Sequence, residues 1–191
     1  MIKKYLIVFF ILLNSHNLFG QEISEWFNQE SDDFLKLWRS GDHKYNNNYD
    51  KYLNYIRKNF AIKSIAYSLI NEQIIESSEQ LTLDLYLKVF ESYLTKTIYN
   101  LTNTSYKGDI KLLSIEERDG IYIISSEIID DNNKIDLYWK VVAINDNYKI
   151  IDVIVENTSY FITKKSEFSK ILRKNNNDIK KLIFELENIY D

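Results

Sequence analysis

The chain contains no cysteine and no proline, and only four of its 191 residues are glycine. Without cysteine the protein cannot use disulfides, so its stability must come from a packed core, which a chain of this length can form. The absence of proline and the scarcity of glycine leave no recognisable linker, repeat or second domain. We therefore expect a single folded domain.

Residue types that carry catalysis are also scarce. Beyond residue 20 the only histidine is His43, in a loop rich in Asn, Asp and Lys. A zinc site needs several convergent His, Cys or carboxylate ligands, and a hydrolytic triad needs a base oriented against a nucleophile. The glycines are isolated, so no phosphate-binding loop is present. We predict no catalytic residue, no metal and no cofactor.

The first 20 residues have the pattern of a secretory signal peptide. Lys3 and Lys4 form a charged start, Tyr5–Leu13 is an unbroken apolar run, and Gly20 is a small residue suited to the cleavage position. The alternative is an uncleaved anchor, but the apolar run is shorter than the roughly 20 residues that span a bilayer. We expect cleavage after Gly20, which leaves residues 21–191 as the mature domain.

The charge of the chain argues against a nucleic-acid partner. There are 24 basic and 28 acidic residues, for a net charge of −4, and loss of the two N-terminal lysines would make the charge more negative. Non-specific binding to nucleic acid requires a dense positive surface. We therefore predict that the protein binds no nucleic acid.

Apolar residues in the first half of the mature chain recur at the three-and-four spacing of one helical face. The pattern predicts helices over residues 23–38, 49–60, 62–69 and 80–101. For the last of these, Ser77 and Gln80 have the spacing of a capping box. The helical stripe of this segment includes Leu83, Leu87, Phe90, Leu94, Ile98 and Leu101.

The second half of the chain changes to strand periodicity. Residues 109–117, 121–129, 134–145 and 148–156 read as four strands, and the short polar turns between them favour antiparallel hairpins. Two helices then close the chain, the second capped near Asn177 or Asp178. The expected fold is α+β, with N-terminal helices, a four-stranded antiparallel meander, and C-terminal helices packed on the sheet around an apolar cavity.

The predicted strands are apolar on both sides. In the third strand Leu137, Trp139 and Val141 alternate with Tyr138 and Val142. An antiparallel sheet with one face in water should show a cleaner polar face. Either the sheet is covered on both faces, or part of the apolar excess lines a ligand cavity.

The segment Tyr148–Phe168, YKIIDVIVENTSYFITKKSEF, is the most specific pattern in the chain. It resembles the C-terminal signature of the MlaC family, the periplasmic phospholipid carriers of the maintenance-of-lipid-asymmetry pathway. In that family the stretch reads roughly W-K-V-x-D-V-x-I-E-G-V-S-x-x-x-x-Y-R-x-x-F. The matching positions are Lys149, Asp152, Val153, Glu156, Ser159 and Phe168, and the departures are Tyr148, Asn157 and Lys165. Weaker resemblance covers Phe60–Ile70 and Gln80–Leu101, in the family's order.

The resemblance implies a non-enzymatic phospholipid carrier in the periplasm, with the acyl chains of a diacyl lipid held between sheet and helices. It further implies two partners, an inner-membrane ABC transporter complex and an outer-membrane lipoprotein–porin complex. Apolar periodicity together with the resemblance predicts that the lipid contacts Leu69, Phe90, Leu94, Tyr99, Leu137, Trp139, Val141, Val153 and Val155.

Two predictions concern charged residues near the C-terminus. Basic residues are frequent from Lys164 to Lys181, and we expect Lys170 and Arg173 to dock an acidic partner, the alternative being an ordinary solvated helix face. Lys165 stands on an apolar stripe where the family has arginine. It is predicted to pair with Asp152 and so to pin the helix to the last strand.

Two other classes of function remain open at this point. A non-catalytic periplasmic adaptor could use the same fold with a filled core. An enzyme could be argued only by analogy of fold. Lipid that copurifies with the protein would distinguish the carrier from the adaptor.

Overall fold

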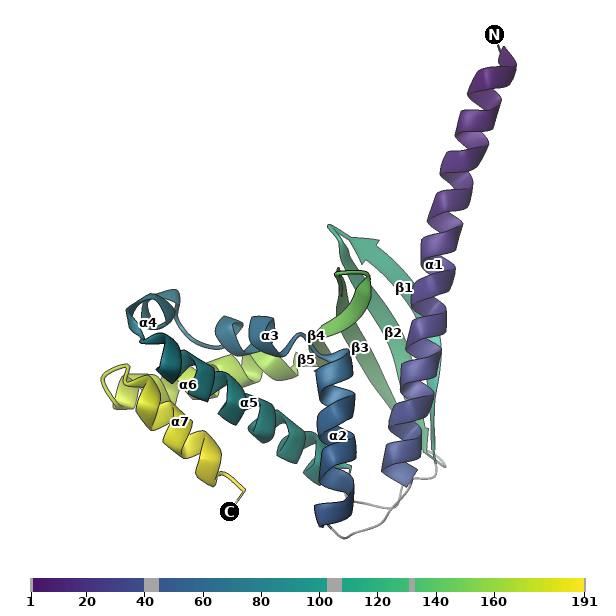
Figure 1. The fold of residues 1–191 in the computed structure, drawn as a ribbon. Helices are drawn as coiled ribbons and strands as arrows, with labels where there is room; N and C mark the ends of the chain where they lie inside the picture. Colours follow the sequence, from purple (N-terminus) through teal and green to yellow (C-terminus); the bar gives the residue numbers. More distant parts are fainter. Residues whose placement is uncertain (1, 40–44, 103–107, 131–132, 191) are drawn as a thin grey trace.

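The structure is a computed structural model that describes residues 2–39, 45–102, 108–130 and 133–190, with side chains for 20–39, 48–102, 108–129 and 134–190. The chain runs from helices through a meander of strands and back to helices (Figure 1), which confirms the predicted α+β fold. The first helices are α1 (Ile2–Arg39), α2 (Tyr45–Asn59), α3 (Ile62–Ser68), α4 (Glu72–Ser77) and α5 (Gln80–Leu101). The strands are β1 (Asp109–Arg118), β2 (Ile121–Asp130), β3 (Asn133–Ile144), β4 (Asn147–Val155) and β5 (Thr158–Ser159). The last helices are α6 (Tyr160–Lys174) and α7 (Ile179–Asn188).

The sheet is an antiparallel meander in the order β1-β2-β3-β4-β5. Asp119-Gly120 joins β1 to β2, and Asn145-Asp146 joins β3 to β4. All four turn residues have positive φ angles, the geometry of the two-residue hairpin turn whose twist matches that of the strands. The two-residue strand β5 was not predicted from the sequence. It pairs with the end of β4 and leads directly into α6.

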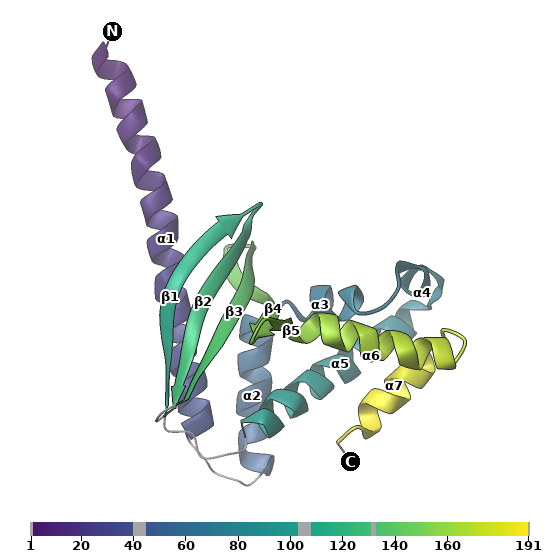
Figure 2. The ribbon, with the colours of Figure 1, turned by 180° about the vertical axis from the view of Figure 1, so that it is seen from behind.

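Helices cover one face of the sheet, which we call the inner face. Its side chains include Ile124, Val141 and Ile150, each at most 3% exposed. On the opposite face Ile123 is half-buried and Ile144 is exposed. Viewed from behind in Figure 2, the strands β1–β3 lie in front of α1, and none of the described helices is drawn across them. The sheet therefore has one covered face, which contradicts the alternative of a sheet covered on both faces.

The helices α3 to α7 extend from the β4 end of the sheet as a second packed layer (Figures 1 and 2). At its centre the ring centroid of Phe168 on α6 lies 6.4 Å from Phe90 and 6.0 Å from Tyr93, both on α5. The Tyr86 hydroxyl donates a hydrogen bond of 2.8 Å to the carbonyl oxygen of Ala66, which fastens α5 to α3. This packing fixes α5 and α6 in place at the edge of the sheet.

Two helix starts test the capping predictions. Asp178 caps α7 by accepting a hydrogen bond from the backbone N–H of Lys180, as predicted. The capping box at Ser77 and Gln80 is wrong, because Ser77 ends α4 and its hydroxyl donates to the carbonyl of Gln73. Helix α5 begins after Glu79, whose side chain makes no capping hydrogen bond. Within the described residues, no helix has both the length and the apolar character needed to cross a membrane.

Candidate functional site

A cavity of about 210 Å³ lies between the inner face of the sheet and the helices packed on it. Helix α5 supplies Leu94, Thr97, Ile98 and Leu101 of its lining, and the C-cap residue Thr102 follows them. The sheet contributes Ile128, Trp139, Val153 and Val155, and the other walls are Phe34, Trp38, Tyr55, Phe60, Tyr160 and Phe161. Aliphatic and aromatic side chains thus make up nearly the whole lining.

One end of the cavity opens to solvent. Leu101, the last residue of α5, is 67% exposed, and Val155, the last residue of β4, is 40% exposed. Trp38 lies in the last turn of α1 and Ile128 is near the end of β2. Four element ends therefore surround the same opening, and large apolar side chains at this rim are available to an apolar ligand.

The threonine hydroxyls of the lining are hydrogen-bonded within the protein, whereas the buried Tyr160 hydroxyl has no hydrogen-bond partner among the described residues. The Thr97 hydroxyl donates to the carbonyl of Tyr93 at 2.8 Å and also pairs with the Tyr190 hydroxyl. Thr102 donates to the Tyr52 hydroxyl at 2.9 Å. The cavity consequently offers dry hydrocarbon surface and no set of convergent polar groups for chemistry.

The structure places the predicted lipid contacts in three groups. Leu94, Trp139, Val153 and Val155 line the cavity. Leu137 and Val141 lie on the inner face of β3 on either side of Trp139, and both are buried. The remaining three, Leu69, Phe90 and Tyr99, are buried core residues outside the cavity lining. Leu69 and Phe90 pack in the cluster around α3 and α5, and the ring of Tyr99 meets that of Tyr52 edge-on with centroids 5.4 Å apart.

The cavity also uses aromatic residues that the sequence did not assign to it. Phe34 and Trp38 come from α1, Tyr55 from α2, and Tyr160 and Phe161 from the first turn of α6. Their helical spacing marked Phe34 and Trp38 as an apolar face, but spacing cannot distinguish a core wall from a cavity wall. No sequence signal identified Tyr160 and Phe161, because their place depends on where α6 begins.

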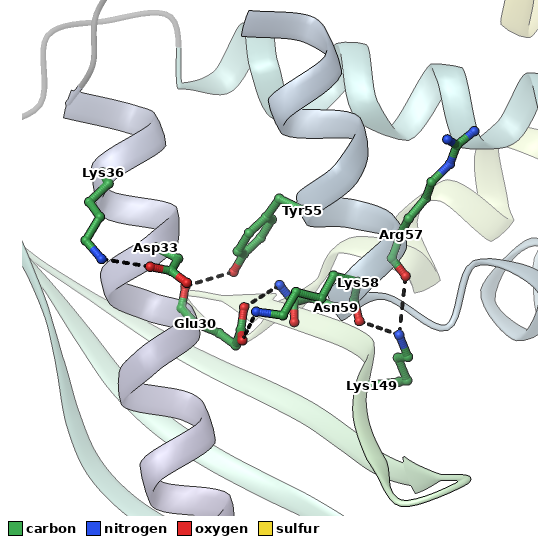
Figure 3. A network of polar contacts seen from close by, with 8 residues as sticks. All are labelled: Glu30, Asp33, Lys36, Tyr55, Arg57, Lys58, Asn59 and Lys149. Atoms are coloured by element: carbon green, nitrogen blue, oxygen red, sulfur yellow. Dashed lines mark hydrogen bonds and ion pairs between the residues drawn. The ribbon is translucent and has the colours of Figure 1, made fainter.

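A polar network at the far side of the cavity joins α1 to α2 and β4 (Figure 3). The Glu30 side chain is only 7% exposed, and its carboxylate binds Lys58 Nζ at 2.5 Å and Asn59 Nδ2 at 2.8 Å. The Tyr55 hydroxyl donates to the backbone carbonyl of Glu30 at 3.2 Å. Lys149 Nζ donates to the backbone carbonyls of the last turn of α2, at Arg57 and Lys58. The network therefore holds the two helices and the strand together.

Within the described residues, no group of three or more His, Cys, Asp or Glu side chains is arranged to hold a metal ion. His43, the one histidine that the sequence considered, lies outside the described residues.

The comparisons with known proteins agree with this architecture. The MlaC protein family model matches residues 28–188, which is most of the chain. The chain belongs to the MlaC family. A phospholipid-binding protein from Ralstonia solanacearum, solved in complex with a phospholipid, has the same fold with a TM-score of 0.72. It is 13% identical in sequence, and the alignment covers 84% of this chain and 92% of that one. No curated protein sequence matches this chain.

In this MlaC-family chain the C-terminal signature fixes the junction between β4 and α6. The Ser159 hydroxyl donates to both oxygens of the Asp152 carboxylate, at 3.0 and 2.9 Å, and accepts a hydrogen bond from the N–H of Ile162. Lys140 Nζ lies 3.5 Å from the same carboxylate. The predicted pair of Asp152 with Lys165 is therefore wrong: Lys165 is exposed on α6, and Asp152 is occupied by a residue closer in space.

Lys170 and Arg173 both lie on α6, and both are exposed. Their predicted role in partner docking stays a prediction. Lys164, a third basic residue of α6, interacts within the protein. Its Nζ lies 2.8 Å from the Glu167 carboxylate and 5.5 Å from the centre of the Tyr160 ring.

Proposed function

We propose that this protein is a periplasmic carrier that binds phospholipid by its acyl chains and moves it between the inner and outer membranes. The observation that carries the proposal is the apolar cavity of about 210 Å³, open at the ends of α5 and β4. Membership of the MlaC family and the fold shared with a protein solved in complex with a phospholipid support it.

The energetics of acyl chains require a protein of this kind. Each methylene moved out of water contributes about 0.8 kcal/mol, so two sixteen-carbon chains contribute more than about 20 kcal/mol in total. Release of such a lipid into water is prohibitively unfavourable. Transfer from a bilayer to a dry cavity exchanges one hydrocarbon environment for another, so the net free energy can be small. A carrier therefore needs an apolar cavity and a docking surface, and it needs no catalytic site.

The size of the cavity has a physical consequence for lipid binding. A volume of about 210 Å³ is below the roughly 300–1,000 Å³ of pockets that enclose drug-sized ligands. The cavity as it stands holds part of an acyl chain, and both chains of a diacyl lipid enter only if its walls separate.

The periplasmic location is part of the proposal. The signal-peptide pattern of residues 1–20 supports export, and the α1 residues that line the cavity, Phe34 and Trp38, lie after Gly20. Cleavage after Gly20 would therefore leave that wall in place. N-terminal sequencing of the protein recovered from a periplasmic fraction should begin at Gln21, and retention of Met1 in the membrane fraction would contradict cleavage.

We further propose that the carrier exchanges lipid with an inner-membrane ABC transporter complex and an outer-membrane lipoprotein–porin complex. The exposed Lys170 and Arg173 on α6 would contact acidic surfaces of these partners. Attraction between exposed charges is screened by salt. Binding to either complex should weaken at high salt and after charge reversal of both residues. Binding that is unchanged in both conditions would remove these residues from the docking surface.

The carrier function is tested by purifying the protein without detergent and measuring its mass under native conditions. Copurified phospholipid, released on denaturation and identified by its fragment masses, is the expected result. A mass equal to that of the polypeptide alone, repeated after incubation with phospholipid vesicles, would favour an adaptor with a filled core. An enzyme would instead turn over the bound lipid, which the same mass spectra would record as cleaved or modified lipid.

A further inference from the structure

Four residues spaced by four along α1 run past the cavity in a single line. Trp38 and Phe34 line the cavity, and Glu30 and Trp26 follow towards the N-terminus of the helix. Because α1 rises about 1.5 Å per residue, successive members of this line are about 6 Å apart. Trp38 is at the open end, so Phe34 lies one helical turn deeper and Glu30 a further turn beyond it.

Two aromatic rings, from α1 and α2, stand between the cavity and a second void. The ring centroids of Phe34 and Tyr55 are 5.5 Å apart, and both residues line the cavity. Phe34 lies one turn of α1 further from the mouth than Trp38. A second, much smaller void of about 10 Å³ lies behind them, lined by the same two rings, by Trp139 and by Glu30 among others. Together with Trp139, which also lines both spaces, the two rings form a partition between the cavity and this void.

The partition is held in place from behind. The Tyr55 hydroxyl donates a hydrogen bond to the Glu30 backbone carbonyl, which ties α2 to α1 at this level (Figure 3). Next to it, the Glu30 carboxylate is bound to Lys58 and Asn59. An acyl chain that passed the rings would meet a charged and hydrogen-bonded cluster, which is unfavourable for hydrocarbon because those groups would lose their partners.

From this arrangement we infer that the rings of Phe34 and Tyr55 set the length of acyl chain that the cavity accepts. The inference rests on the proposed lipid-binding function. It assigns the two residues a role in specificity: a chain enters at Leu101 and Val155, runs along the inner face, and stops at the rings. Replacing either ring by a smaller side chain joins the small void to the cavity. The acyl chain can then extend further along α1, into part of the space between the levels of Phe34 and Glu30.

The test uses saturated fatty acids of increasing length, each below its micelle concentration, titrated into the lipid-free mature protein by calorimetry. While each added methylene is buried, the dissociation constant should fall about fourfold per methylene. It should stop falling once the chain reaches the rings. Tyr55→Leu and Phe34→Leu should each move this limit to a longer chain, and the phospholipids that copurify with them should shift the same way.

Two controls separate the rings from other effects. Lys36→Ala changes an exposed residue on the same helix as Phe34 that does not line the cavity, so its length limit should equal that of the wild type. Leu101→Ala alters the mouth and should change the affinity for all lengths alike without moving the limit.

Circular dichroism and thermal melting show whether Tyr55→Leu and Phe34→Leu are folded. One folded variant is sufficient to test whether the rings set the length limit. A folded ring variant with the wild-type limit overturns the inference, as does a wild type whose affinity keeps rising along the whole series. A wild type that binds neither fatty acid nor phospholipid overturns the proposed function itself, which is a separate outcome.

Discussion

At the scale of single residues, the most informative side chain is that of Ser159. It caps α6 through the N–H of Ile162 and also donates to the buried Asp152 carboxylate at the end of the sheet. One hydroxyl thereby couples the start of a helix to a strand. The signature positions Asp152 and Ser159 are explained by this contact, because neither residue alone could set the angle at which α6 leaves the sheet.

Removing the Ser159 hydroxyl should destabilise the protein by about 1–2 kcal/mol, since the change deletes a helix cap and leaves the buried carboxylate with one partner fewer. The measurement is the free energy of unfolding of Ser159→Ala in urea. Lys165→Ala is the matched control on the same helix, and because Lys165 is exposed its unfolding curve should overlay that of the wild type. A large loss of unfolding free energy in Lys165→Ala, with none in Ser159→Ala, would instead support the pair of Lys165 with Asp152.

The Glu30 network gives a second prediction at this scale. Glu30→Ala leaves the buried Asn59 amide without its acceptor, and we expect a loss of about 1–3 kcal/mol in the free energy of unfolding. Glu30→Gln keeps an acceptor for Asn59 and should lose less. Lys36→Ala, which removes the exposed ion pair with Asp33 on the same helix, should change little. Equal effects of Glu30→Ala and Lys36→Ala would contradict a structural role for the network.

At the scale of elements, β4 separates two environments along one strand. Val153 and Val155 face the cavity, whereas the side chain of Ile154 between them points to the opposite face because successive strand residues alternate. The sequence could not choose between these faces, since both are apolar. The choice was made by the helices, which cover only one face.

A glutamate introduced on the cavity face of β4 and one introduced on the opposite face should affect lipid binding differently. Val153→Glu introduces a charge into the dry cavity and should abolish copurification of lipid, because a carboxylate without a partner is costly in an apolar environment. Ile154→Glu places the same charge on the half-buried opposite face and should retain lipid. Both are measured by mass spectrometry after confirming secondary structure by circular dichroism. Loss of lipid in both variants, or in Ile154→Glu alone, would assign the ligand to a different face.

At the scale of the whole molecule, the cavity is a product of two layers meeting at an angle. The first is the sheet with α1 and α2 on its inner face, and the second is the group of helices α3 to α7 (Figure 1). Rings from α1, α2 and α6 and aliphatic side chains from α5 and the strands meet where the layers join. Every wall of the cavity therefore belongs to an element that has a packing role elsewhere, which is why no separate sequence motif marks the site.

The sequence by itself determined the succession of elements and the family. Periodicities of 3.6 and 2 identified the four long strands and every described helix except the short α4. The turn residues Asp119-Gly120 identified a hairpin, because these signals depend on neighbours a few positions apart. The segment from Lys149 to Phe168 indicated the MlaC family, which the match over residues 28–188 confirms. The capping box predicted for α5 was wrong, because Ser77 lies in the last turn of the short helix α4.

Only the tertiary structure decided which apolar residues line the cavity and which fill the core. Leu94 and Phe90 lie four residues apart on one helical stripe, yet Leu94 reaches the cavity and Phe90 is enclosed against α6. Likewise Asp152 has Ser159 and Lys140 as partners, and the sequence had assigned it Lys165. The physical reason is the same in both cases. Burial and pairing depend on which elements pack against a residue, and packing between distant segments leaves no periodic trace in the chain.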